Sequence, residues 1–270
     1  MDWWWSALAL VLSLVLAGAL AHTLDVAPLQ RTNYRGATIP TAGGIVAVFA
    51  FVMVSSLYVL AHDRRLPAAE LIAVTGFAAV GFFDDVVGSH SARGLRGHVT
   101  AGLRGQLTSG ATKLLVGLAL AAAIAPVYAD GWRRTLVVLV IAGAANVANL
   151  LDLAPARATK VAGVALAGLA LAAGARQAIE GAPAWFYGAT LGLVPAELRE
   201  RLMLGDAGAN ALGAIVGIAA VRACGGSTAT LVIAAVVVLA INVAGEFVSF
   251  SRVIDGTPPL RAFDRLGRKR

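Results

Sequence analysis

Long uninterrupted apolar runs are the feature that most restricts the fold of this chain of 270 residues. Nine windows reach or approach the roughly 20 mostly apolar residues that a helix needs to cross the bilayer core. They cover residues 3–21, 43–61, 69–83, 111–128, 135–151, 161–175, 185–194, 207–221 and 228–250. The apolar residues do not alternate with polar ones, which excludes a membrane β-barrel. We therefore predict an all-α polytopic membrane protein with about nine transmembrane helices.

The composition agrees, since 59% of residues are apolar, 14% are charged and the mean hydropathy is +0.78. A net charge of +7 could indicate nucleic acid as a partner, but in a membrane protein it reflects basic cytoplasmic loops, so we expect none. If the N-terminus lies outside, six of the 22 basic residues fall in outer segments: Arg64, Arg65, Arg133, Arg134, Arg176 and Arg222. This asymmetry predicts an N-out, C-in orientation.

Two further features narrow the class of protein. The single cysteine, Cys224, excludes an internal disulfide framework. Residues 19–21 read Ala-Leu-Ala, as at a signal-peptide cleavage site, but no basic residue precedes the first window, so we expect it to remain as a span.

The few carboxylates and amides of the chain gather at one end of the predicted spans. The positions are Asp84 and Asp85 after the third window, Asn146, Asn149 and Asp152 at the end of the fifth, Asp206 and Asn210 in the eighth, and Glu246 in the ninth. Because Asn146, Asn149 and Asp152 are spaced three residues apart, they lie on one face of the predicted helix. Each group alone has an ordinary interpretation as a loop start, an interhelical hydrogen bond or, for Asp206, an N-cap. Their common location predicts a site that opens to the cytoplasm.

Several carboxylates with amide oxygens suit Mg²⁺, or Mn²⁺ in its place, since hard cations take oxygen ligands together with substrate phosphates. Lys113, at the start of the fourth window, could bind further phosphate charge. The four histidines lack zinc spacing, and we find no P-loop or nucleophile elbow. These residues predict Mg²⁺-assisted phosphoryl transfer at a membrane surface.

Four segments, in order, resemble motifs of the polyprenyl-phosphate N-acetylhexosamine-1-phosphate transferases. This superfamily includes the phospho-MurNAc-pentapeptide translocase and the UDP-GlcNAc:undecaprenyl-phosphate GlcNAc-1-phosphate transferase. The segments are residues 33–44, with Asn-Tyr-Arg-Gly and Ile-Pro-Thr-Ala-Gly-Gly, 81–85 (Gly-Phe-Phe-Asp-Asp), 146–152 (Asn-Val-Ala-Asn-Leu-Leu-Asp) and 203–213, which begins Met-Leu-Gly-Asp. Lys113 stands where the family has a lysine at the start of a helix.

The resemblance implies transfer of a sugar-1-phosphate from a UDP-amino-sugar to polyprenyl phosphate, such as undecaprenyl phosphate, with release of UMP. The product would serve cell-envelope glycan synthesis, for example of peptidoglycan. Asp206 would hold Mg²⁺, with Asn149 and Asp85 as further ligands. Asp84 or Asp85 would bind or deprotonate the lipid phosphate, and Asp152 would line the diphosphate and nucleotide region.

The arrangement of spans, loops and charges also predicts a domain layout. Residues 1–251 would form a single transmembrane catalytic domain with active-site loops at 22–42, 84–110, 152–160 and 195–206, in the cell membrane. Residues 252–270 would form a basic cytoplasmic tail attracted to anionic membrane lipid. The predicted substrate-binding residues are Arg35, Lys113, Asn146, Asn149, Arg157, Lys160, Asn210 and Glu246. By analogy alone, a homodimer is plausible.

The chain departs from the family pattern in two places. The second aspartate that usually follows the Asn-Leu-x-Asp motif is missing, and Arg157 and Lys160 stand in that loop. A histidine-rich loop near the last helices is replaced by residues 246–252 and the tail. The missing aspartate leaves one alternative, a degenerate paralogue that binds polyprenyl phosphate or a partner protein. A second alternative is a cation-coupled transporter that uses the carboxylates as ion ligands, against which the clustering at one membrane face argues.

Overall fold

The computed structural model is helical almost throughout and describes residues 3–20, 23, 25–26, 29–32, 35–63, 65–87 and 109–268. Within these ranges, each of the nine predicted windows falls on a helix of at least 16 residues. They are α1 (Trp3–Leu20), α2 (Gly43–His62), α3 (Ala68–Val87), α5 (Ser109–Ile124), α6 (Arg133–Leu151), α7 (Arg157–Ala173), α9 (Ala182–Leu198), α10 (Gly205–Ala223) and α11 (Thr228–Phe247). The all-α prediction is confirmed. Most of the predicted loop 84–110, and Asn33 and Tyr34 of the first motif, lie outside the described residues.

Short elements connect or extend these helices. They are η2 (Ala125–Val127), α8 (Ala175–Ala178), α12 (Phe250–Gly256), α13 (Pro258–Arg265), β1 (Gln30–Thr32) and β2 (Thr38–Pro40). The two strands pair antiparallel, with Arg31 opposite Ile39. Pro258 lies in the first turn of α13, where its missing N–H costs nothing. Most of the described residues of the predicted basic tail therefore lie in the short helices α12 and α13.

Within the described part of the chain, five helices are long and apolar enough to cross a bilayer. They cover Trp3–Leu20, Gly43–His62, Gly110–Val127, Arg133–Leu151 and Thr228–Phe247. The central helix α10 is not among them, because it carries Asp206, Asn210 and Arg222 among glycines and alanines. Its surroundings are protein rather than lipid, since most of its residues are buried. Nine crossings and their orientation therefore stay predictions.

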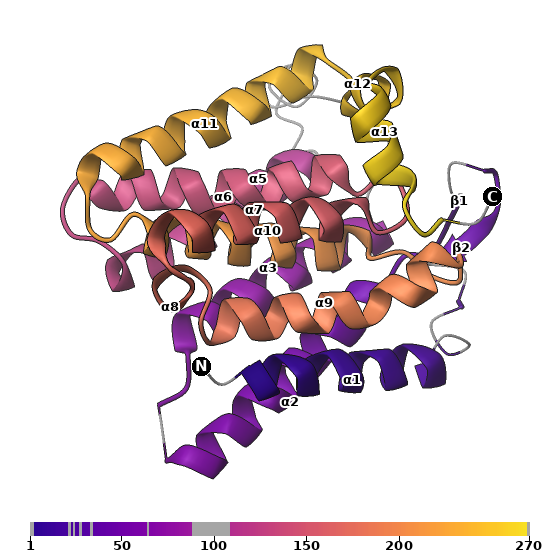
Figure 1. Ribbon diagram of the computed structural model, residues 1–270, viewed down its shortest axis with the longest axis horizontal. Helices are drawn as coiled ribbons and strands as arrows, with labels where there is room; N and C mark the ends of the chain where they lie inside the picture. Colours follow the sequence, from indigo (N-terminus) through magenta and orange to yellow (C-terminus); the bar gives the residue numbers. More distant parts are fainter. Residues whose placement is uncertain are drawn as a thin grey trace.

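Small residues let the other helices pack closely around α10, which contacts α6, α3, α7, α2 and α9 (Figure 1). A side chain on Gly44 of α2 would overlap the backbone of Gly208, and one on Gly213 would overlap α6 at Ala144. Without a hydrophobic driving force between helices in lipid, such close backbone approach supplies the packing energy.

Backbone hydrogen bonds tie the hairpin to the start of α10. The Met203 N–H donates to the Pro40 carbonyl (2.7 Å), and the N–H groups of Gly43 and Gly44 donate to Met203 (3.0 Å) and Leu204 (2.8 Å). Gly205 has φ +71°, a conformation that favours glycine, and a side chain there would overlap the Thr41 carbonyl. The Ile-Pro-Thr-Ala-Gly-Gly motif therefore fixes where α10 begins.

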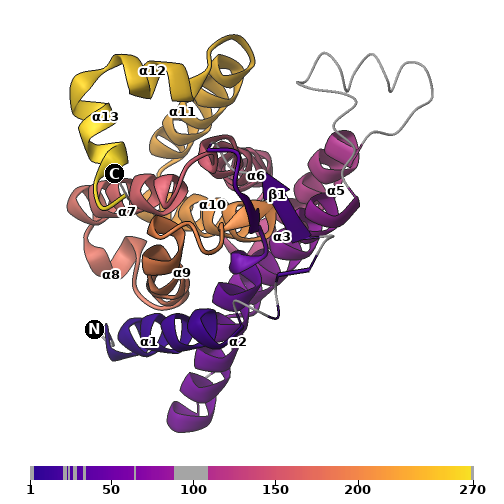
Figure 2. The same ribbon diagram turned by 90° about the vertical axis from the view of Figure 1, so that its right-hand side faces the viewer.

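One end of the helix bundle carries the hairpin, the turn between α6 and α7, and the pair α12–α13. This end lies on the right in Figure 1 and faces the viewer in Figure 2. In Figure 2, α12 and α13 arch beside the end of α7, and the strands lie next to α10 and α3. The residues predicted to form the site lie toward this end.

Candidate functional site

The last turn of α3 and the first turn of α10 lie side by side because of a glycine. A side chain on Gly81 would overlap the backbone of Asp206 and Ala207, so only glycine permits this approach. One helical turn later, α3 presents Asp84 and Asp85. Packing at a single glycine thus brings together carboxylates that lie more than a hundred residues apart in the sequence.

Lys113 lies between the carboxylates of these two helices. Its ammonium group pairs with Asp206 and lies 3.6 Å from Oδ2 of Asp84. Asn149 completes the group: with its amide oriented to satisfy both bonds, Nδ2 donates to Asp206 Oδ1 (2.9 Å) and Oδ1 accepts from Lys113 Nζ (3.0 Å). We call Asp84, Lys113, Asn149 and Asp206 the carboxylate cluster. The structure brings these four predicted site residues together, from α3, α5, α6 and α10.

Asp85 is buried and holds the start of α10. Its Oδ2 accepts the Ala207 N–H (3.2 Å), and its own backbone carbonyl accepts from the Arg31 guanidinium. A carboxylate at this position satisfies an unpaired N–H and complements the positive end of the helix dipole. One interpretation of the sequence was that Asp206 caps the N-terminus of this helix. In the structure the capping carboxylate belongs to Asp85 instead, because α3 packs against the first turn of α10.

Asp152 ends α6 and is buried in the turn that follows. Burial raises the pKa of Asp152 well above its usual range, and the negative charges of Glu197, Asp206 and Asp85 add to the effect. The turn continues to Ala156, which has φ +57°, an uncommon backbone conformation for a residue with a side chain. Asp152 therefore lies within electrostatic reach of the carboxylate cluster, on a strained turn.

Glu197 is a residue that the sequence analysis missed. It is 2% exposed at the end of α9, and its Oε1 accepts the Leu204 N–H (3.1 Å) just before α10 begins. Its carboxylate also faces the backbone of Ala156 in the turn after Asp152. Glu197 thus links the two turns that carry Asp152 and Asp206. The only signal in the sequence was an acidic residue at the edge of a short apolar window.

Other predicted substrate-binding residues have mainly structural partners. Asn146 donates to Asn242 of α11 (2.7 Å), and Asn210 donates to the Asp206 carbonyl one turn back on α10 (2.5 Å). Arg35 pairs with Glu200 (3.2 Å), and Glu246 is exposed on the last turn of α11. Their predicted contacts with substrate stay predictions.

Arg157 and Lys160 connect the start of α7 to the C-terminal helices. The Arg157 guanidinium donates to both oxygens of Asp264 (2.8 and 2.9 Å) and to Ser251 Oγ (2.7 Å). Lys160 donates to the carbonyls of Asp264 (2.9 Å) and Leu266 (2.7 Å). Arg157 and Asp264 are only 5% and 4% exposed, so this bidentate ion pair is buried.

The oxygens of Asp206 and Asn149 decide whether the cluster fits a magnesium ion. Among the described residues, no three acidic, histidine or cysteine side chains lie close enough to enclose a metal. Asp206 could still contribute carboxylate oxygens to Mg²⁺, and Asn149 its amide oxygen once Lys113 moves away from it, since Mg²⁺ is commonly held by one or two carboxylates with substrate phosphates completing the shell. The residues therefore fit a metal that binds together with a phosphorylated substrate.

Comparison with known families gives an independent result. Residues 67–224, more than half of the chain, match glycosyl transferase family 4. The chain belongs to glycosyl transferase family 4. This is the family of the polyprenyl-phosphate hexosamine-1-phosphate transferases. No curated protein matches the chain.

The matched segment of glycosyl transferase family 4 includes every member of the carboxylate cluster, and also Asp85 and Asp152. The hairpin, α11 and the C-terminal helices lie outside it. Membership in this family, together with the apolar helices, identifies the chain as a membrane protein.

Proposed function

We propose that the protein transfers a sugar-1-phosphate from a UDP-amino-sugar to polyprenyl phosphate. An oxygen of the lipid phosphate attacks the β-phosphorus of the nucleotide sugar. The bond from that phosphorus to the bridging oxygen breaks, and UMP leaves. The products are a polyprenyl-diphospho-sugar and UMP, and the glycan would serve the cell envelope.

The observation that carries this proposal is the ammonium group of Lys113 among Asp84, Asn149 and Asp206, all within the segment that matches the family. Two anionic substrates repel each other unless positive charge lies between them, and phosphoryl transfer depends mainly on positioning and charge neutralisation. Lys113 would shift from its carboxylate partners to a phosphate oxygen when substrates bind.

The remaining residues have complementary roles in the proposal. Asp206 and Asn149 would hold Mg²⁺, which when bound supplies positive charge beside the diphosphate. Asp84 would accept or position the proton of the lipid phosphate. Asp85 would keep the first turn of α10 in place through its bond to the Ala207 N–H. With the N-terminus outside, the reaction would take place at the cytoplasmic membrane face.

The test is a transfer assay with the full chain in detergent, undecaprenyl phosphate and a panel of UDP-sugars, with Mg²⁺ or with EDTA. Mass spectrometry measures the lipid-linked sugar, and chromatography measures UMP. We expect both products in equal amounts, from at least one donor and only with divalent metal. Absence of both from every donor would overturn the proposal.

A second candidate is a non-catalytic member that binds polyprenyl phosphate. The observation that favours it is that Arg157 and Lys160, which replace an acidic residue in the loop after Asp152, are bonded to the C-terminal helices. It predicts saturable binding of undecaprenyl phosphate with no lipid product from any donor. The same assay, with lipid binding measured in parallel, separates the two candidates.

A further inference from the structure

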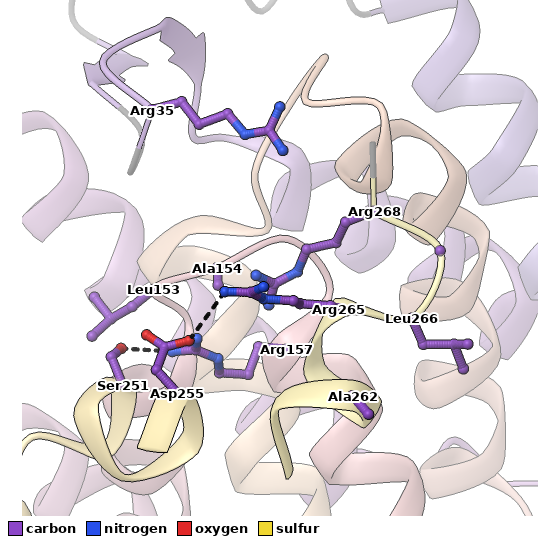
Figure 3. A pocket seen from close by; sticks show the side chains of 11 residues that line it. Arg35, Leu153, Ala154, Arg157, Ser251, Asp255, Ala262, Arg265, Leu266 and Arg268 are labelled. Carbon is purple, nitrogen blue, oxygen red and sulfur yellow. Dashed lines mark hydrogen bonds and ion pairs between the residues drawn. The ribbon is translucent and has the colours of Figure 1, made fainter. Parts of the chain in front are cut away.

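A cavity of about 760 Å³ lies at the end of the bundle that carries the predicted site. Its walls come from the hairpin loop at Arg35, from the turn at Leu153 and Ala154, and from α12, α13 and the residues that follow (Figure 3). Small-molecule sites commonly occupy about 300–1,000 Å³. The cavity is therefore large enough for a nucleotide or a diphosphate.

Arginines dominate the charged lining of this cavity, which we call the arginine cavity. Arg35, Arg157, Arg265 and Arg268 line it, and Asp255 is the acidic residue among the lining groups. Figure 3 shows Arg35 reaching in from the hairpin side toward Arg265 and Arg268 of the C-terminal segment. Guanidinium groups present a planar fork of donors that matches phosphate oxygens.

The arginines of the cavity differ in how strongly they are held. Arg157 is bound to Asp264 and Ser251, and Arg268 pairs with Asp264 (2.5 Å), so these two groups build the wall. Arg265 is 65% exposed, with its nearest carboxylate, Asp255, at 4.0 Å, and Arg35 is 40% exposed. Arg265 and Arg35 can reorient toward an anion at little cost, because exposed ion pairs contribute little energy.

Two features indicate that the walls of this cavity are held in fixed positions by the fold. The buried pair Arg157–Asp264 and the bonds from Lys160 fix α13 to the start of α7, and so fix the position of Arg265. On the other side, Leu153 and Ala154 directly follow Asp152, whose carboxylate is within electrostatic reach of Asp206 and Asp85. No member of the carboxylate cluster lines the cavity, but the turn that forms this wall continues directly from Asp152.

We propose that the arginine cavity binds an anion that carries a diphosphate, with Arg35 and Arg265 as the contacting groups. Resting on the proposed function, we identify this anion as the nucleotide-sugar donor, held here by its diphosphate before that diphosphate reaches the carboxylate cluster. Arg157, Lys160 and Asp264 are positioning residues that hold α13 in place. The same donors would suit inorganic diphosphate or an anionic lipid headgroup, so the test compares these sources directly.

The experiment measures equilibrium binding of UDP to the full chain in nanodiscs of neutral phosphatidylcholine, in EDTA so that no metal contributes. Further arms use inorganic diphosphate as a competitor, and nanodiscs that contain phosphatidylglycerol. The variants are Arg265→Ala and Arg35→Ala. The matched control is Arg252→Ala, which removes the same charge from the same C-terminal region at an exposed position outside the cavity.

We expect each cavity variant to weaken UDP binding about tenfold, as for loss of one charge-assisted contact, and the control to change it less than twofold. Inorganic diphosphate should compete, and phosphatidylglycerol should leave UDP affinity unchanged. Equal loss in Arg252→Ala would show that bulk charge alone attracts the anion. Unchanged binding in both cavity variants, or displacement of UDP by phosphatidylglycerol, would overturn the proposal.

The outcomes also separate this proposal from the proposed function. If UDP binding depends on Arg265 and Arg35 but no lipid product forms from any donor, the arginine cavity stands and the transferase proposal fails. If transfer occurs and both variants keep the KM of the wild type for the donor, the transferase proposal stands and the cavity proposal fails.

Discussion

The carboxylate cluster and the arginine cavity lie toward the same end of the molecule but are built in different ways. The cluster joins the ends of long helices, and glycines such as Gly81 and Gly205 bring them into contact. The cavity joins the turn after α6 to a hairpin loop and two short helices, and the hairpin loop and short helices lie outside the segment that matches glycosyl transferase family 4.

The two regions also differ in charge. The cluster has two carboxylates around one lysine, whereas the cavity presents four arginines and one carboxylate. The first arrangement suits a cation and proton chemistry, and the second suits an anion. In the two proposals, the chemistry depends on helices within the segment that matches the family, and donor binding depends mainly on Arg35 and Arg265, which lie outside that segment.

The largest effect is expected in the carboxylate cluster, from Asp206→Asn. Loss of this charge removes the proposed metal ligand and the partner of Lys113, so transfer should fall by about 10³-fold, the scale of losing one main electrostatic group of an active site. The mass-spectrometric assay measures it. Asp130→Asn, at a carboxylate that is 96% exposed, is the control and should keep full activity. Comparable activity in the two variants would remove Asp206 from the mechanism.

The next largest effect is expected on the arginine-cavity side, from Arg157→Leu. This change leaves Asp264 without its main partner, and breaking a buried ion pair by removing one member costs about 3–5 kcal/mol. The C-terminal helices should detach, and trypsin should release them at least 10²-fold faster, followed by mass spectrometry. Arg201→Leu, at an exposed position, is the control. Cleavage at the wild-type rate would show that α13 is held by other contacts.

A pH-dependent effect of smaller size is expected from the same ion pair. Burial by itself raises the pKa of Asp264, but the hydrogen bonds and charges of Arg157 and Arg268 outweigh burial and leave the pKa below its ordinary value of 3.8. The ionised form therefore stabilises docking of α13 fully above about pH 4, and this contribution is lost as the pH falls through the lowered pKa.

Asp264→Asn tests this dependence. The variant should dock more weakly than the wild type at pH 7, by about 2 kcal/mol, and the difference should shrink below pH 3.8. A fluorophore on Leu260→Cys, in a Cys224→Ser background, reports docking during titration. Asp255→Asn, an exposed partner of Arg265, should keep the wild-type profile. Parallel profiles for Asp264→Asn and the wild type would contradict the assignment.

The smallest effect is expected from Asn146→Ala, away from both regions. The Asn146–Asn242 bond joins α6 to α11, and such a bond in a membrane protein is worth about 0.6 kcal/mol. Asn242→Ala should lower thermal stability more than Asn146→Ala, because Asn242 also donates to the Gly143 carbonyl of α6 (3.1 Å), and both variants should keep the donor KM within twofold. A rise in KM for Asn146→Ala alone would instead support the predicted contact with substrate.

Much of the helical core could be predicted from the sequence because its signals are local. Apolar runs locate the nine long helices of the described residues, and the Asn-x-x-Asn-x-x-Asp spacing puts Asn149 on one face of α6 with Asp152 at its C-terminal end. The predicted family is likewise confirmed by the match over residues 67–224, which includes three of the four predicted motifs. Glu197 was missed because its role depends on two turns that come together only in the folded chain.

By itself, the sequence determined the helical class, the positions of the apolar segments and the set of charged residues available for a site. Hydrophobicity and helix periodicity are local patterns that extend over a few helical turns, so they can be recognised in the sequence without knowledge of the tertiary structure. Only the tertiary structure decided that Asp85, not Asp206, caps α10, and that Arg157 holds α13. Those outcomes depend on close backbone contact at Gly81 and on an ion pair between residues more than a hundred positions apart, and distances of this kind exist only once the chain has packed.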